Sequence, residues 1–154
     1  MGGSLRRQSV WLADDGCQCL YEYGNADHQQ LRPWSTSPGL QQLKSRLCEI
    51  AGLPVNLFNS AFGQYYEGSF QRLDWHADDE PELGPKPIIA SLSLGTERVF
   101  QLRHQRTKQR ISIPLPHGSL LMMGAGIQNH WQHRIAKVKS LSEARVNFTF
   151  RYMN

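Results

Sequence analysis

The 154-residue chain has no long hydrophobic run. Stretches such as Ser119–Met123 are far shorter than the roughly 20 apolar residues that a membrane-spanning helix requires. No apolar segment follows the arginines near its start, as one would in a secretory signal peptide. Its three cysteines, Cys17, Cys19 and Cys48, lack the second pair of a zinc site. We therefore expect a soluble, intracellular protein (cytoplasmic, or nuclear if eukaryotic) with reduced thiols and no membrane partner.

Repeats and low-complexity segments are also absent. Hydrophobic residues make up 40% of the chain and charged residues 19%, as in a folded globular protein. The length suits one domain with its own core and is too short for two ordinary ones. The formal charge of +4 is compatible with a polyanionic partner, although many basic proteins bind no nucleic acid.

One helix is well marked near the end of the first third. Ser37 can cap it, Pro38 suits its first turn, and Gly52 with Pro54 ends it. Its apolar residues form a single stripe along one face: Leu40, Leu43, Leu47 and Ile50. We expect this helix to pack against a sheet as a support.

After the helix the hydrophobic period becomes that of strands. Short segments separated by Gly, Pro or charged turns span 55–66, 72–78, 88–94, 98–103, 110–115, 119–123 and 145–152. Segment 103–110 is the expected tip of a hairpin. The predicted fold is mainly β with flanking helices, and its sheets form a sandwich or a closed barrel, jelly rolls included.

The last of these segments has two contrasting faces. Its apolar face carries Val146, Phe148, Phe150 and Tyr152, and its polar face carries Arg145, Asn147, Thr149 and Arg151. An ordinary strand would turn such a polar face to water. Alternatively, the polar face lines a cavity, in which two arginines could hold a small dicarboxylate by paired hydrogen bonds.

A candidate metal site lies earlier in the chain. His76 and Asp78 would point the same way in a strand, so an imidazole and a carboxylate could bind one ion. His133 is the best third ligand, although His130 competes for this role. Two histidines and one carboxylate on one face of an iron ion leave positions open for a co-substrate and oxygen.

Five ordered blocks carry a family resemblance. They are Asp74-Trp75-His76-Ala77-Asp78-Asp79-Glu80-Pro81, the segment 87–95, the segment 117–123, Trp131-Gln132-His133-Arg134, and the segment 145–151. Together they resemble the AlkB family of Fe(II)- and 2-oxoglutarate-dependent nucleic-acid dioxygenases, and most of all its branch that acts on single-stranded DNA and RNA. The resemblance implies a double-stranded β-helix (jelly roll). Residues 1–154 would form a single dioxygenase domain, with substrate recognition and the supporting helix in 1–54 and the jelly-roll core in 55–154.

The resemblance also implies roles for individual residues. His76, Asp78 and His133 would be the catalytic iron ligands. The co-substrate 2-oxoglutarate would be bound by Gln64, Tyr66, Arg145, Asn147 and Arg151. The family usually has Asn at the position of Gln64, so this amide reaches one carbon further. Asp79, Tyr23 and Glu80 would contact the substrate base.

By this resemblance the chain uses Fe(II), 2-oxoglutarate and O2 to demethylate 1-methyladenine or 3-methylcytosine. Formaldehyde, succinate and CO2 would be released. The expected partner is single-stranded DNA or RNA, with no obligate protein partner. Residues that could follow phosphates are Arg103, Arg106, Lys108, Arg110, Lys137 and Lys139. Two alternatives stay open: a dioxygenase acting on a protein or small molecule, and an inactive nucleic-acid-binding relative.

Overall fold

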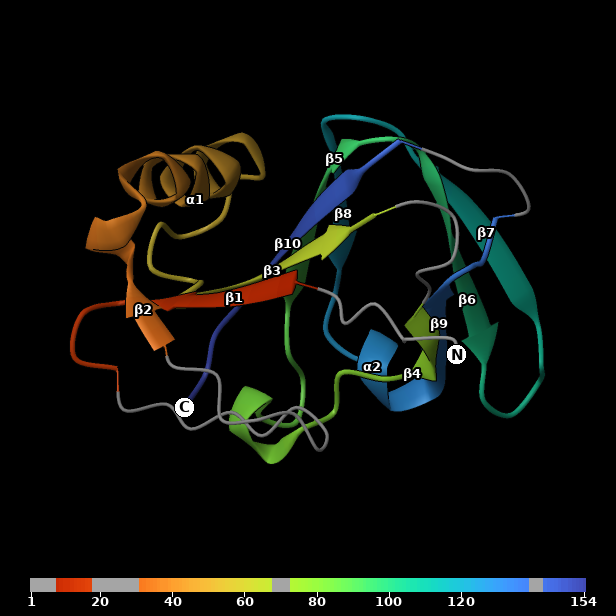
Figure 1. The fold of residues 1–154 in the computed structure, drawn as a ribbon. Coiled ribbons are helices and arrows are strands. Elements are labelled where there is room, and N and C mark those ends of the chain that lie inside the picture. Colours follow the sequence, from red (N-terminus) through yellow and green to blue (C-terminus); the bar gives the residue numbers. More distant parts are fainter. Residues whose placement is uncertain (1–7, 18–30, 68–72, 139–142) are drawn as a thin grey trace, which may run out of the picture.

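The computed structural model describes residues 8–17, 31–67, 73–138 and 143–154, which form two β-sheets and flanking helices (Figure 1). The larger sheet is six-stranded in the order β2 (Leu31–Pro33), β1 (Gln8–Ala13), β3 (Ser60–Tyr66), β10 (Arg145–Arg151), β5 (Ile89–Gly95) and β8 (Ser119–Met123). The smaller sheet is four-stranded in the order β4 (Leu73–His76), β9 (Trp131–Ile135), β6 (Arg98–His104) and β7 (Arg110–Leu115).

Short helices connect or flank these strands. They are η1 (Trp34–Thr36), α1 (Pro38–Ile50), η2 (Pro81–Leu83) and α2 (Ile127–His130). None of the helices among the described residues is long and apolar enough to cross a membrane. The strands pair antiparallel except β1 and β2, which are parallel. The expected β-rich jelly-roll architecture is confirmed.

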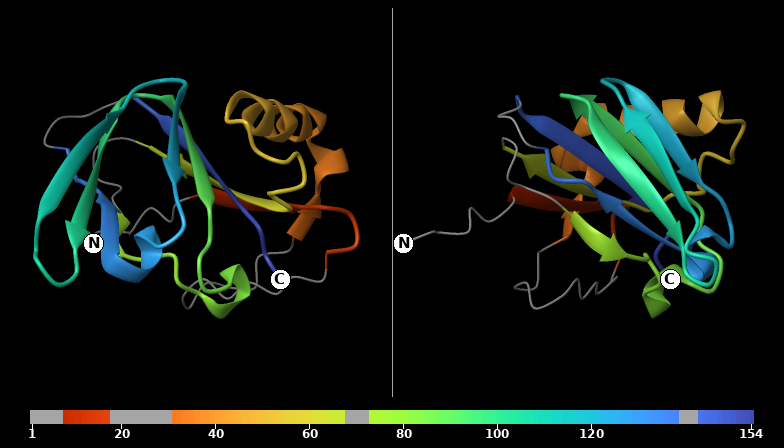
Figure 2. Two further views of the ribbon diagram at one scale, coloured as in Figure 1. Left: turned by 180° about the vertical axis from the view of Figure 1, so that it is seen from behind. Right: turned by 90° about the vertical axis from the view of Figure 1, so that its right-hand side faces the viewer.

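Helix α1 covers the outer side of the six-stranded sheet, away from the four-stranded one (Figure 2). Its end is a Schellman motif, in which Gly52 (φ 64°) donates to the Glu49 carbonyl and Leu53 donates to the Cys48 carbonyl. Ser37 holds the N-cap position, but its side chain makes no capping hydrogen bond among the described residues.

The predicted apolar stripe of α1 is only partly right. Leu47 is buried and Leu40 and Leu43 pack against the sheet, whereas Ile50 is 66% exposed. Ile50 is the last residue of the helix. The expectation of reduced thiols holds for Cys48, which is free and buried, and is wrong for Cys17, which is disulfide-bonded.

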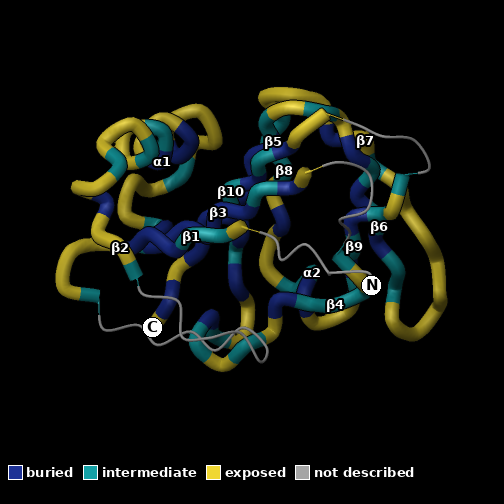
Figure 3. The backbone as a smooth tube through the Cα atoms, in the orientation of Figure 1, coloured by how far each residue is buried: buried dark blue, intermediate teal, exposed yellow. Residues whose placement is uncertain are grey.

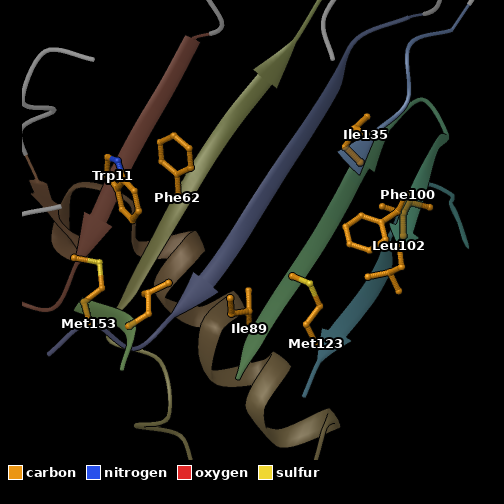
Figure 4. Close-up of a cluster of buried hydrophobic side chains, with 10 residues drawn as sticks. Trp11, Phe62, Ile89, Phe100, Leu102, Met123, Ile135 and Met153 are labelled. Atoms are coloured by element: carbon orange, nitrogen blue, oxygen red, sulfur yellow. The ribbon is translucent and has the colours of Figure 1, made fainter. Parts of the chain in front are cut away.

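Two apolar clusters hold the layers together. The first fills the space between the sheets, where Trp11 stacks on Phe62 and side chains from both sheets meet (Figure 4). The second lies between the six-stranded sheet and α1, where Phe150 of β10 packs near Trp34 and Phe58. Strand β10 therefore has buried side chains on both faces (Figure 3). One face of β10 is apolar, so its polar face must be buried between the sheets.

Candidate metal centre and anion pocket

Three potential metal ligands meet at one point between the sheets. His76 ends β4, Asp78 follows two residues later, and His133 lies in β9 opposite His76. The Asp78 Oδ1 atom lies 3.4 Å from His76 Nε2 and 3.7 Å from His133 Nε2. Ligands at about 2.1 Å from a metal ion and at right angles to each other lie about 3 Å apart, close to these separations. The two nitrogens and one oxygen therefore suit one divalent ion of the iron type.

Neighbouring groups fix how these ligands present their lone pairs. The Nδ1–H of His76 donates to the Asp74 carbonyl at 2.7 Å, which leaves Nε2 with a lone pair facing Asp78. Arg151 donates from Nη2 to Asp78 Oδ2 at 2.6 Å. The other oxygen, Asp78 Oδ1, is buried and has no hydrogen-bond partner among the described residues. A buried carboxylate oxygen without a donor is what a metal ligand requires.

Burial and charge set the protonation of the three side chains. Burial alone would raise the pKa of Asp78, but Arg151 and the two imidazoles outweigh it and hold this pKa well below its usual range. Burial lowers the pKa of His133 to about 4, more than Asp78 raises it. Burial would also lower the pKa of His76, but the neighbouring Asp78 carboxylate raises it. At neutral pH the site thus offers an ionised carboxylate and a neutral His133.

The polar face of β10 forms the wall of a pocket beside this centre. Its side chains are all at most 7% exposed: Arg145, Asn147, Thr149 and Arg151. The Asn147 Oδ1 atom accepts from Arg145 Nη2 at 2.8 Å and from the Ser91 hydroxyl at 2.9 Å. The pocket interpretation of this face is therefore correct, and the alternative that it faces water is wrong.

Arg145 is the buried cation at one end of this pocket. Its Nη2 donates to Ser93 Oγ at 2.9 Å, and its guanidinium lies 5.1 Å from the Tyr66 ring centre. None of the described acidic side chains forms a salt bridge with it, and its Nε and Nη1 atoms lack an acceptor among the described residues. Burial lowers the pKa of Arg145 from its ordinary value. A carboxylate of a small ligand would supply the missing acceptors.

The structure brings the predicted metal ligands and the predicted pocket residues into one cavity. They line it together: Gln64, Tyr66, His76, Asp78, His133, Arg145, Asn147 and Arg151. Gln64 Oε1 accepts from the Tyr66 hydroxyl at 3.0 Å, so the longer amide takes part in the pocket wall. His130, the competing histidine, is exposed in α2, and its ring lies 6.4 Å from that of His104.

The residues predicted to contact the substrate are less buried than Asp78 and His133, where the structure describes them. Asp79 follows Asp78 directly and is exposed, and Glu80 is partly buried. Tyr23 lies outside the described residues.

Sequence reasoning missed three polar residues of the site. Ser91 and Ser93 alternate with leucines in β5, and this period of two could have assigned both serines to one face, which is the face of the sheet that also carries Asn147. Gln128 of α2 contacts the backbone of Asp78, and no local pattern marks it.

The sequence of the chain is similar to those of known oxygenases. The sequence profile of the 2OG-Fe(II) oxygenase superfamily matches residues 4–151. The alpha-ketoglutarate-dependent dioxygenase alkB homolog 3 of Rattus norvegicus is 43% identical over 123 residues, which cover 74% of this chain and 41% of that protein. The human protein of the same name is also 43% identical over 123 residues, covering 74% and 42%.

A second group of relatives is named for its reaction. The DNA oxidative demethylase ALKBH2 of Mus musculus is 37% identical over 128 residues, covering 78% of this chain and 52% of that protein. The chain thus spans about half, or slightly less, of the length of the curated relatives it matches.

Proposed function

The chain belongs to the 2OG-Fe(II) oxygenase superfamily and, by its likeness to AlkB homologues, to the AlkB family within it, and we propose that it oxidatively demethylates N-alkylated nucleic-acid bases. The observation that carries this proposal is the convergence of His76, Asp78 and His133 next to a buried arginine without a carboxylate partner among the described residues. The family implies Fe(II), 2-oxoglutarate and O2 as cofactor and co-substrates.

His76 Nε2, Asp78 Oδ1 and His133 Nε2 would hold the iron(II) ion. When bound, iron, 2-oxoglutarate and O2 supply the oxidising chemistry: the co-substrate leaves as succinate and CO2, and the methyl group leaves as formaldehyde. Arg151 keeps the Asp78 carboxylate ionised and oriented through the 2.6 Å hydrogen bond. Phe100 stacks on the His133 ring and helps to exclude water from the centre.

Arg145 would bind the far carboxylate of 2-oxoglutarate. Its Nη2 is already fixed by Ser93 and Asn147, which leaves the remaining N–H groups to be shared with a carboxylate. Asn147 is itself held by Ser91 and Thr149, so the guanidinium is oriented before any ligand arrives. Tyr66 and Gln64 would close the opposite wall of this pocket.

A methylated base would approach from the side of Asp79. Methylation at N1 of adenine or N3 of cytosine leaves a cation, which a nearby carboxylate attracts more than it attracts a neutral base. Tyr23 would stack on the flipped base, and Glu80 would contact it or support the loop. Flipping a base costs least in a single strand, so single-stranded DNA or RNA is the proposed partner.

The hairpin between β6 and β7 offers a surface for phosphates. Arg106 and Lys108 are exposed at its tip. Arg110 is exposed at the start of β7, and its partner across the ladder, Arg103, is partly buried. Arg103 lies 4.5 Å from the Trp75 ring centre and donates to Gln132. Lys137 is exposed on the neighbouring segment, and Lys139 lies outside the described residues.

The decisive experiment uses iron(II), 2-oxoglutarate, oxygen and a single strand that carries 3-methylcytosine. Mass spectrometry would measure restored cytosine, formaldehyde and succinate. We expect all three from the wild-type chain and none from His133→Ala. The matched control is His130→Ala, which removes an exposed imidazole three residues earlier and should leave turnover unchanged.

Other outcomes point to different functions. Succinate without a repaired base would assign the oxygenase to a protein or small-molecule substrate. Absence of both products, with retained binding of the strand, would indicate an inactive nucleic-acid-binding relative. Comparing 1-methyladenine with 3-methylcytosine, and DNA with RNA, would then establish the substrate preference.

A further inference from the structure

A buried amide links the metal-binding loop to α2. The Asp78 backbone N–H donates to Gln128 Oε1 at 2.9 Å, across 50 residues of sequence. Gln128 is 1% exposed, and its Nε2 lies 3.5 Å from Met123 Sδ in β8. Both ends of the side chain are therefore engaged, and the amide orientation is fixed by these partners.

Gln128 also sits next to the segment that carries the third metal ligand. Helix α2 runs directly into β9, in which His133 follows Gln128 by five positions. The helix is tied at both ends, because Ile127 N–H donates to the Gly124 carbonyl and the His130 carbonyl accepts from Gln105. A displacement of Gln128 would thus move the loop of Asp78 relative to the strand of His133.

The hydrogen bond to Gln128 holds the backbone of Asp78, whose side chain is held, within the part of the chain that the structure describes, at one oxygen only. The Asp78 side chain is held at Oδ2 by Arg151, while Oδ1 has no donor among the described residues. The direction of Oδ1 therefore depends on where the Asp78 backbone lies. Gln128 Oε1 fixes that backbone by accepting from the Asp78 N–H group. Loss of this acceptor would leave the buried Asp78 N–H without a hydrogen-bond partner.

We propose that Gln128 is a positioning residue of the metal centre, which sets the separation of the Asp78 and His133 ligands through the Asp78 backbone. This proposal rests on the proposed function, because it assumes that the three ligands bind a metal ion. Outer-shell groups of this kind typically change metal affinity by about 10–100-fold when they are removed.

The test compares Gln128→Leu with Gln128→Glu by calorimetric titration of Mn²⁺ into the metal-free chain. Mn²⁺ prefers the same oxygen and nitrogen ligands and does not oxidise readily. Leucine removes the acceptor, so we expect Mn²⁺ affinity to fall by about 10–100-fold. Glutamate keeps an acceptor oxygen at the same reach, so we expect it to restore affinity to within about threefold.

A destabilised control separates positioning from general loss of structure. Leu43→Ala removes a partly buried side chain of α1, far from the metal ligands, and should lower the thermal midpoint without changing Mn²⁺ affinity. The visible spectrum of bound Co²⁺ supplies a second measurement, since it reports coordination geometry. We expect it to change in Gln128→Leu and to stay as in the wild type in Leu43→Ala.

The outcomes distinguish this inference from the proposed function. Equal Mn²⁺ affinity in the wild type and His133→Ala would overturn the metal site itself. Loss of binding in His133→Ala, with wild-type affinity and Co²⁺ spectrum in Gln128→Leu, would overturn only the positioning role. Equal losses of affinity in Gln128→Leu and Leu43→Ala would also overturn it, since the effect would then follow stability.

Discussion

Replacing Arg151 with methionine should expose how strongly the centre depends on its buried counter-charge. The Arg151 and Asp78 side chains are 5% and 2% exposed, and their closest atoms are 2.6 Å apart. Burial raises the pKa of Asp78, and Arg151 is the largest of the influences that lower it. Methionine removes the cation while retaining much of the side chain. In the presence of a chelator, Asp78 must then stay charged without its partner or become protonated.

The expected cost can be stated as a free energy of unfolding. Removing one partner of a buried ion pair typically destabilises a protein by about 3–5 kcal/mol, because the remaining charge stays desolvated. The guanidinium also lies 5.9 Å from the Trp11 ring centre, and that contact is worth about 0.5–1 kcal/mol or somewhat more. We therefore expect Arg151→Met to lower the free energy of unfolding by about 3–5 kcal/mol.

Urea unfolding of four chains would measure this coupling: wild type, Arg151→Met, Asp78→Asn and the double variant. Asparagine is neutral, so the double variant contains no unpaired charge. It should cost about 2–3 kcal/mol less than the sum of the single variants. A loss below about 1 kcal/mol in Arg151→Met, or additive effects in the cycle, would refute the argument. Arg151→Lys, which keeps the charge, should recover part of the stability.

Three further predictions use the same unfolding assay. Burial lowers the pKa of His133 in the folded chain to about 4 from its ordinary 6.5. Its contribution to the free energy of unfolding is therefore fully present above pH 6.5 and is lost as the pH falls from 6.5 towards 4. The metal-free chain should therefore lose about 2 kcal/mol at pH 5 that His133→Asn does not lose. Gly95 has φ 90°, and in Gly95→Ala the new Cβ would clash with the Ala144 carbonyl oxygen, so we expect this variant to lower the free energy of unfolding by at least about 2 kcal/mol. Gly118 has φ 76° and open space around it, so Gly118→Ala should cost only about 1 kcal/mol. Mn²⁺ at a hundred times its Kd should add about 2.7 kcal/mol to the wild type and nothing to His133→Ala.

The sequence predicted those helices and strands whose ends are determined by residues next to them in the chain. Helix α1 begins at Pro38, whose ring fixes φ at a helical value, and ends before Gly52, which readily adopts the left-handed conformation (φ 64°) of the helix end. Strand β9 was missed as a strand, although Trp131, His133 and Ile135 alternate with polar residues. Strand β2 has three residues and no pattern of its own, so its parallel pairing with β1 could not be foreseen.

The site was predictable where residue type and spacing carry the chemistry. The alternation in β10 assigned Arg145 and Asn147 to one face, but it could not tell whether water or protein covers that face. That depends on β3 and β5, which flank β10, and on the four-stranded sheet opposite. Gln128 escaped because its partner is the backbone N–H of Asp78, and a pattern of side chains does not reveal a backbone donor.

The polar interior links ligand binding to folding. Arg145 is 1% exposed with two nitrogen atoms lacking acceptors among the described residues, and Asp78 Oδ1 lacks a donor. Each such buried group costs about 1–3 kcal/mol. A carboxylate at Arg145 and a cation at Asp78 would remove both costs in the folded chain, and the unfolded chain has no preformed site for either ligand. We therefore expect the two ligands together to raise the free energy of unfolding by more than the burial of their apolar surface provides. The buried polar groups that lower the stability of the ligand-free chain are the same groups that would bind the ligands.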